Sequence, residues 1–326
     1  MGHTPRWQAL AAALAVTFAM AGCGGSSGGS DSPALPIAGG EAVAPAPGAP
    51  APAPTPGASA PAQTGNIALD GRNWINYRRA QAGVPLVAGN AQLDNAALGH
   101  SEYLRINPPL SHEQVAGRQG FTGATLVERL NAAGYTLDRA RGYATGEVIS
   151  GTSNGSGFFM AEELITAIYH RFVIFEPMFQ EIGTGATTSS AGYHVFTADF
   201  ASHYGFGPGI ARGAVVTWPF NGQTGVARNF FSDTEQPDPV PDLNEVGYPV
   251  SVHANIDAAL AVNSFTLRPR GGSEVPVLRI APLARDKSAA SIVPLQPLAA
   301  ATTYEVNFNG TVNGAAVTRA WSFTTR

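Results

Sequence analysis

The spacing of apolar residues changes near Phe200, and this change limits the chain to a fold of two unlike parts. Between Leu69 and Phe200, apolar residues recur mainly at helical spacing. After Phe200 they form short runs separated by Pro, Gly and Asn, as in β-proteins. We therefore expect an α+β domain followed by an all-β domain. The 326 residues are enough to give each domain its own core.

Helical spacing predicts four helices in the first part. The clearest begins at Asn90 and ends at Ile106, where Asn107-Pro108-Pro109 stops it. The others are expected at residues 69–82, 125–133 and 159–172. Strands are expected at residues 147–150, 180–187 and 193–200, so helices come first and a small sheet follows.

The second part contains seven short β runs. In one of them, Tyr304, Val306 and Phe308 alternate with polar residues, which is typical of a half-buried strand. Seven short strands with turn residues between them are typical of an immunoglobulin-like sandwich. The runs lie at residues 215–217, 248–253, 264–267, 275–280, 291–295, 303–309 and 315–324.

The first 22 residues predict export. A weakly basic start precedes an apolar run from Ala9 to Ala21, which has signal-peptide length and is too short to span a bilayer. The run ends Met20-Ala21-Gly22-Cys23, which resembles a bacterial lipobox. Cys23 is the single cysteine of the chain. We therefore expect a lipid anchor on Cys23; the alternative is an ordinary signal peptide with an incidental cysteine.

The residues that follow predict a tether and a location. Residues 23–64 are rich in Gly, Ser, Pro and Ala, and nine of the 25 prolines lie between Pro33 and Pro61. Such a segment cannot bury a core and acts as a spacer. The chain is thus expected in the bacterial cell envelope, bound to a membrane through its lipid. Gly24, which stands where Asp would retain a lipoprotein, indicates the outer membrane if the host has one.

The charge pattern gives no reason to expect a nucleic-acid partner. The formal net charge is -4, and only 13% of residues are charged. Basic residues are scattered and form no cluster of the kind that binds phosphates.

Three residues carry the predicted chemistry: His112, Glu147 and His170. Each lies at the edge of a patterned segment. Two imidazoles and one carboxylate suit zinc or another divalent cation, or an acid–base site. A hydrogen-bonded cluster that holds helices on the sheet is the structural alternative. The decisive question is whether the three side chains converge.

A weaker signal lies at residues 151–155, which match the G-x-S-x-G pattern of a nucleophile elbow, with Asp199 and His203 following in order. Its Gly/Ser-rich surroundings favour a loop.

Eight short motifs from Leu69 to Phe200 resemble, in order, those of the CAP superfamily, also called the SCP-like proteins, in its bacterial form. No single motif is specific to the family, but eight motifs in the family's order are hard to obtain by chance. They are Asn76–Arg79 with Gly83, Ala96–Leu104, Ser111-His112, Ala133–Tyr135, Gly146–Ile149, Tyr169–Phe179, Glu181–Gly185 and Ala198–Phe200.

The resemblance implies an α-β-α sandwich at residues 65–204, with a cleft that gathers His112, Glu147 and His170. This chain departs from the pattern at three positions: Ala167 stands where other members carry a second Glu, Leu164 replaces a Trp and Val148 replaces an Asn. The site is therefore a triad at most. Residues 205–326 resemble, more loosely, bacterial immunoglobulin-like modules.

The resemblance does not choose among the activities of the family, and we expect a binding or interaction protein of the cell envelope rather than an enzyme. A lipid, a protein or a cell-wall component is the expected kind of ligand, with apolar residues near Phe158, Phe159, Phe172 and Phe175 lining the cleft. The alternative is a metal-dependent hydrolase of peptides or cell-wall material.

Overall fold

The computed structural model describes residues 59–282 and 287–326. The predicted signal peptide at residues 1–22, the lipid on Cys23 and all but the end of the tether lie outside these residues. Among the described residues, no helix combines the length and the apolar character needed to cross a bilayer.

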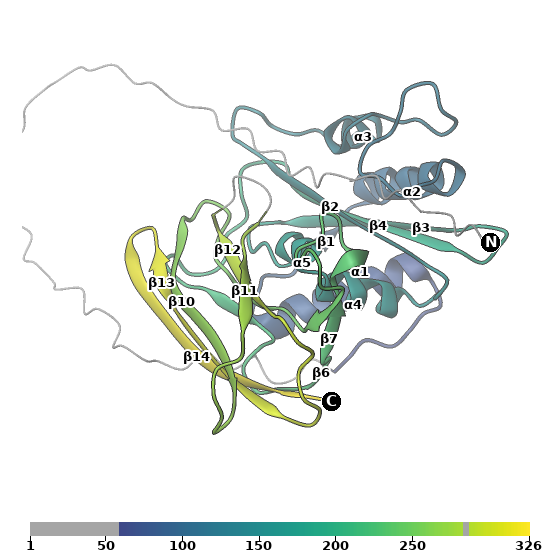
Figure 1. Ribbon diagram of the computed structural model, residues 1–326. Helices are drawn as coiled ribbons and strands as arrows, with labels where there is room; N and C mark the ends of the chain where they lie inside the picture. Colours follow the sequence, from purple (N-terminus) through teal and green to yellow (C-terminus); the bar gives the residue numbers. More distant parts are fainter. Residues whose placement is uncertain (1–58, 283–286) are drawn as a thin grey trace, which may run out of the picture.

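The first part is a three-layer α-β-α sandwich (Figure 1). Its central sheet has the strand order β1-β3-β4-β2, with β1 parallel to β3 and the other neighbours antiparallel. Helices α2 and α3 cover one face, and α1, α4 and α5 cover the other. The bounds are α1 Ile67–Ala82, β1 Ala88–Gly89, α2 Ala91–Ile106, α3 Leu126–Ala132, β2 Ala144–Thr152, α4 Gly157–Thr166, α5 Ile168–Ile174, β3 Glu181–Thr188 and β4 His194–Ser202.

Short polar side chains fix where the first helices begin. The Asn90 side chain accepts hydrogen bonds from the first turn of α2, and Thr125 forms a capping box with Glu128 at the start of α3. Such caps satisfy backbone N–H groups that have no partner inside the helix. The sequence therefore predicted α2 and α3 to within a residue or two.

The single helix predicted at residues 159–172 is wrong. The backbone is extended at Ala167, so α4 ends at Thr166 and α5 begins at Ile168. Periodicity continues through the break because both helices turn their apolar residues toward the same core. The break exposes the N-terminus of α5, which receives its cap from a distant part of the chain.

Two glycines let α2 lie directly on the sheet. A Cβ at Gly183 would overlap the backbone of Leu93, and one at Gly185 would overlap the backbone nitrogen of Leu98. The Ser101 hydroxyl, one turn further along α2, donates to the Gly185 carbonyl oxygen at 3.1 Å. This close approach explains the Gly-x-Gly pattern of β3.

The second part is all-β. One four-stranded sheet has the order β10-β13-β14-β6, a second has β11-β12-β9-β5, and β7 and β8 form a small ribbon. All seven predicted strands exist; β6, β7 and β8 are short and were not predicted. The bounds are β5 Val216–Trp218, β6 Gln223–Val226, β7 Asn229–Phe231, β8 Glu245–Gly247, β9 Val250–His253, β10 Leu260–Pro269, β11 Val277–Ile280, β12 Ala289–Pro294, β13 Thr303–Val312 and β14 Ala315–Thr325, with a short 3-10 turn at Ser232–Thr234.

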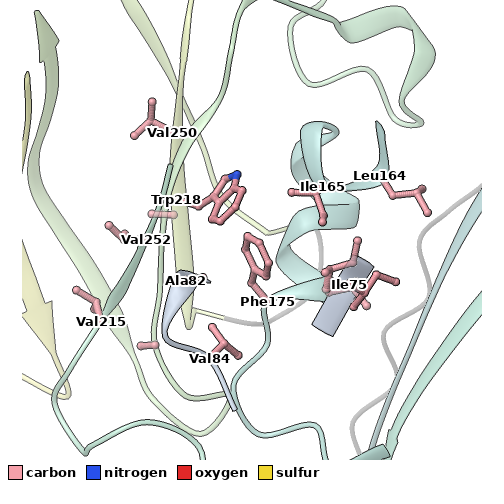
Figure 2. Close-up of a cluster of buried hydrophobic side chains, with 14 of the residues drawn as sticks. Ile75, Ala82, Val84, Leu164, Ile165, Phe175, Val215, Trp218, Val250 and Val252 are labelled. Atoms are coloured by element: carbon pink, nitrogen blue, oxygen red, sulfur yellow. The ribbon is translucent and has the colours of Figure 1, made fainter. Parts of the chain in front are cut away.

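One hydrophobic core runs through both parts. Figure 2 shows Trp218 and Val252 of the β-sheets beside Ile165 and Phe175 of the helical layer. The Phe175 and Trp218 rings lie 4.9 Å apart, and Trp218 is fully buried. The boundary predicted near residue 204 therefore separates two architectures that share a single core.

Candidate functional site

His112 and Glu147 meet, as the sequence predicted. Glu147 projects from β2 toward α2 and α3, and His112 Nδ1–H donates to its Oε1 at 2.8 Å. The second carboxylate oxygen accepts a hydrogen bond from Arg129 Nη2 at 2.6 Å. Burial alone would raise the pKa of Glu147, but the Arg129 charge and the His112 hydrogen bond hold that pKa well below its usual range. Glu147 is therefore an ionised, buried partner of Arg129.

His100 is a buried structural neighbour of this pair. Its Nε2–H donates to the Ser111 carbonyl oxygen at 3.0 Å, and its Nδ1 accepts from the Gln114 amide at 3.0 Å. Burial lowers the pKa of His100 to about 4, so the ring is neutral at neutral pH. These bonds position the loop that carries His112.

Asp199 is a second carboxyl group on the same face of the sheet. It lies opposite Glu147 in the β2–β4 ladder and is fully buried. Burial, reinforced by the negative charge of Glu147, raises the pKa of Asp199 well above its usual value. Asp199 therefore favours its uncharged, protonated form more strongly than an exposed aspartate does.

His170 has a different partner from the one predicted. Its Nδ1–H donates to Oε1 of Glu235 at 2.9 Å. The same carboxylate accepts the backbone N–H groups of residues 168, 169 and 170 at 2.8, 2.6 and 3.0 Å, and Glu235 is fully buried. Glu235, which comes from the second part of the chain, is thus the cap of α5.

The predicted triad is therefore divided between two faces of the sheet. His112 and Glu147 lie on the side of α2 and α3, whereas α5 and His170 lie on the other. Both oxygens of Glu147 have donors, and Arg129 already supplies a positive charge there. Within residues 59–282 and 287–326, no group of three or more His, Cys, Asp or Glu side chains is placed to hold a metal ion. The arrangement thus does not fit the predicted zinc site.

A groove of about 730 Å³ lies where the two parts of the chain meet. The groove is lined by residues 149–152 of β2, by Phe159 and Glu163 of α4, and by β7. His170 lines it as well. The Ser150 hydroxyl donates to Glu163 at 2.6 Å, and burial raises the pKa of Glu163. Of the four aromatic residues expected in the cleft, Phe159 lines this groove.

Arg129, Glu163 and Glu235 are the residues that sequence reasoning missed. Arg129 lies in a helix whose pattern shows only amphipathicity. Glu235 lies in a run rich in Pro and Asp that reads as a linker. Arg129 and Glu235 are recognisable only from their burial, and Glu163 only from its place in the groove; the sequence reveals neither for an isolated charged residue. Ser153 of the G-x-S-x-G pattern lies in an exposed turn, while Asp199 is buried beneath α2 and α3.

Part of this chain is similar to known proteins. Among curated proteins there is no match. Among solved structures, an extracellular protein containing a SCP domain from Bacillus anthracis str. Ames has 21% sequence identity and a TM-score of 0.35, over 41% of this chain and 39% of that one. An outer surface protein from Borrelia burgdorferi has 13% identity and a TM-score of 0.35, over 40% of this chain and 89% of that one. The family match is more direct: residues 73–200, which build the α-β-α sandwich, match CAP, the Cysteine-rich secretory protein family.

Proposed function

We propose that this chain is a binding protein of the bacterial cell envelope, whose ligand occupies the groove between the CAP segment, residues 73–200, and the C-terminal sheets. The groove itself carries the proposal. Its volume of about 730 Å³ lies within the roughly 300–1,000 Å³ usual for ligand sites. Phe159 and Phe231 line it from opposite parts of the chain and are 43% and 48% exposed.

Binding has more support than metal-dependent hydrolysis. A catalytic zinc site needs an open position and ligands free to coordinate. Glu147 is instead neutralised by Arg129, and His170 is held by Glu235. The same contacts would serve to fix a rigid frame around the groove, which favours recognition of a ligand.

Photo-crosslinking in the host tests this proposal. The full chain would carry the photoreactive amino acid p-benzoylphenylalanine at Phe159 or at Phe231, in separate variants. We expect ultraviolet light to give covalent adducts at both positions, and mass spectrometry would identify the chemical class of the adduct. Leu278, 39% exposed on strand β11 and not among the residues that line the groove, is the matched control position. Adducts no more frequent at the groove than at Leu278 would refute the proposal.

The location belongs to the same proposal. Residues 1–22 direct export, Cys23 carries the lipid, the tether spans the distance from the membrane, and the C-terminal sheets form an immunoglobulin-like spacer or docking module. Metabolic labelling with radioactive palmitate is expected to label the full chain and to fail with Cys23→Ser. Label retained in Cys23→Ser would exclude this anchor.

A further inference from the structure

Strand β2 has an unusual edge. It pairs through nine residues with β4, in unbroken register from Ala144 opposite Ser202 to Thr152 opposite His194. It is the last strand of its sheet, and within the described residues β4 is its only strand partner. An edge strand presents unpaired backbone N–H and C=O groups, which proteins usually protect with Pro, Lys, bulges or shortness. β2 has none of these four features, but Ala144–Val148 are buried, so its accessible part is residues 149–152, of which three are partly exposed.

The other sheet edges in the described residues are protected. β1 has only two residues, and β5, β6 and β11 have three or four. β10 has ten residues, but its register is interrupted between Val262 and Ser264, and it ends in Arg268-Pro269. A regular edge without Pro, Lys or a bulge therefore occurs at β2, and its partly exposed end, residues 149–152, lies at the groove.

The groove leaves room for one strand along this edge. Residues 149–152 line it, and four residues of an extended chain span about 14 Å. β7 also lines the groove. Phe159 of α4 and Phe231 of β7 are both lining residues, so they can contact side chains of a strand that lies in the groove.

We propose that β2 accepts an extended segment of a partner protein as an additional strand of the sheet, with its side chains against Phe159 and Phe231. Main-chain hydrogen bonds supply the affinity in this mode of recognition, and the wall residues supply the specificity. The inference rests on the proposed function and names the class of its ligand. The chain's own tether is a poor occupant, because its nine prolines lack N–H donors. A second copy of the chain is also a poor occupant, because the helices that flank its own β2 would have to enter a groove that β7 already lines.

Selected peptides test the proposal directly. The full purified chain would be used to select binders from a phage-displayed library of random octapeptides, and the selected peptides would be synthesised. N-methylation of alternate amides removes the donors on one edge of a strand. We expect one alternating set of N-methyl groups to weaken binding at least tenfold and the other set to change it less than twofold. Hydrogen exchange at residues 149–152 should slow in the complex.

Variants locate the binding. Phe159→Ala and Phe231→Ala should each weaken binding of the selected peptide, and Leu278→Ala should leave it unchanged. Failure to enrich peptides, equal effects of both methylation sets, or unchanged exchange at residues 149–152 would each overturn the proposal. A peptide-independent dimer that buries β2 in sedimentation and exchange experiments would also overturn it. A crosslinked adduct at Phe159 that is a lipid or a glycan would leave the proposed binding function intact and reject the strand.

Discussion

At the scale of single residues, Arg129 determines what Glu147 can do. The guanidinium has no exposed side-chain surface, and its ion pair with Glu147 is 2.6 Å long. Two charges buried together depend on each other, because removing one leaves the other without compensation. This ion pair therefore holds α3 against β2.

Glu147→Gln should lower the free energy of unfolding by about 3–5 kcal/mol, because it leaves the Arg129 charge without its counterion. Urea denaturation at pH 7 measures this. Adding Asp199→Asn should increase the loss, since Asp199 could otherwise ionise and replace Glu147. Glu102→Gln, which breaks a partly exposed pair with Arg105, should cost less than about 1 kcal/mol. Equal losses in Glu147→Gln and Glu102→Gln would contradict this account.

His253 makes stability depend on pH. Burial, followed by the charge of Arg171, lowers its pKa from 6.5 to about 3. Between these values the unfolded chain binds a proton that the folded chain does not, so stability falls as the pH falls. The contribution reaches about 1.4 kcal/mol per pH unit.

The variant His253→Gln should show a shallower loss of stability than the wild type between pH 6 and pH 4. Urea denaturation at several pH values gives both slopes. At pH 8 the His253 ring is neutral in both states, so a difference measured there reports changed packing and the changed hydrogen bond with Ser251 rather than titration. Parallel slopes for the two proteins would show that His253 does not titrate as described.

The sequence predicted half of the site, for a physical reason. The motif around Glu147 and the Ser-His pair at residue 112 are local patterns, and a shared fold brings them together. The bond between His170 and Glu235 spans 65 residues and joins two parts of the chain. No local pattern marks such a pair, so the partner of His170 could not be predicted.

At the scale of elements, α2 and β3 are positioned by glycine. Gly185→Ala should lower stability by about 1–3 kcal/mol or more, because its Cβ would force the backbones apart. Gly99→Ala, on α2, is the control. Its Cβ would meet only Thr122 Cγ2 at 3.8 Å, and alanine favours a helix by about 0.5–1 kcal/mol. Melting temperatures that move in opposite directions are expected; a stable Gly185→Ala would refute the close contact.

Elements were predictable where local chemistry defines their ends. Asn90 and Thr125 mark helix starts in the sequence and in the structure. The break at Ala167 carries no such mark, since Ala is a good helix former and the apolar spacing continues. Strands β6, β7 and β8 are too short to show alternation, so their pairing depends on the tertiary structure.

At the scale of the whole molecule, Glu235 joins the two parts. Its carboxylate caps α5 from the second part of the chain, and the shared core adds apolar contacts around Trp218. Arg171 strengthens the junction: it donates to the Pro249 carbonyl oxygen at 2.7 Å and its guanidinium lies 4.9 Å from the centre of the Tyr248 ring. Both parts should consequently unfold together.

Differential scanning calorimetry should show one transition for the wild type. Glu235→Ala should cost about 2 kcal/mol or more, because three backbone N–H groups, two of them in buried hydrogen bonds, lose their acceptor, and should broaden or split the transition. Glu235→Gln keeps an acceptor oxygen and should cost less. Glu305→Ala, in exposed pairs with Arg268 and Arg270, is the control, with an expected cost below about 1 kcal/mol. Two separate transitions in the wild type would contradict a joint unit.

The cap on α5 also bears on how such a chain can be inherited. A gene fragment that ended after residue 200 would encode the whole CAP match and omit Glu235, leaving the first turn of α5 without its acceptor. Recombination could pass on this segment in working form only together with the stretch that holds Glu235, or after a substitute cap had arisen. The segment that keeps the cap of α5 is therefore longer than the family match, and the junction of a chimaeric protein should lie after Glu235.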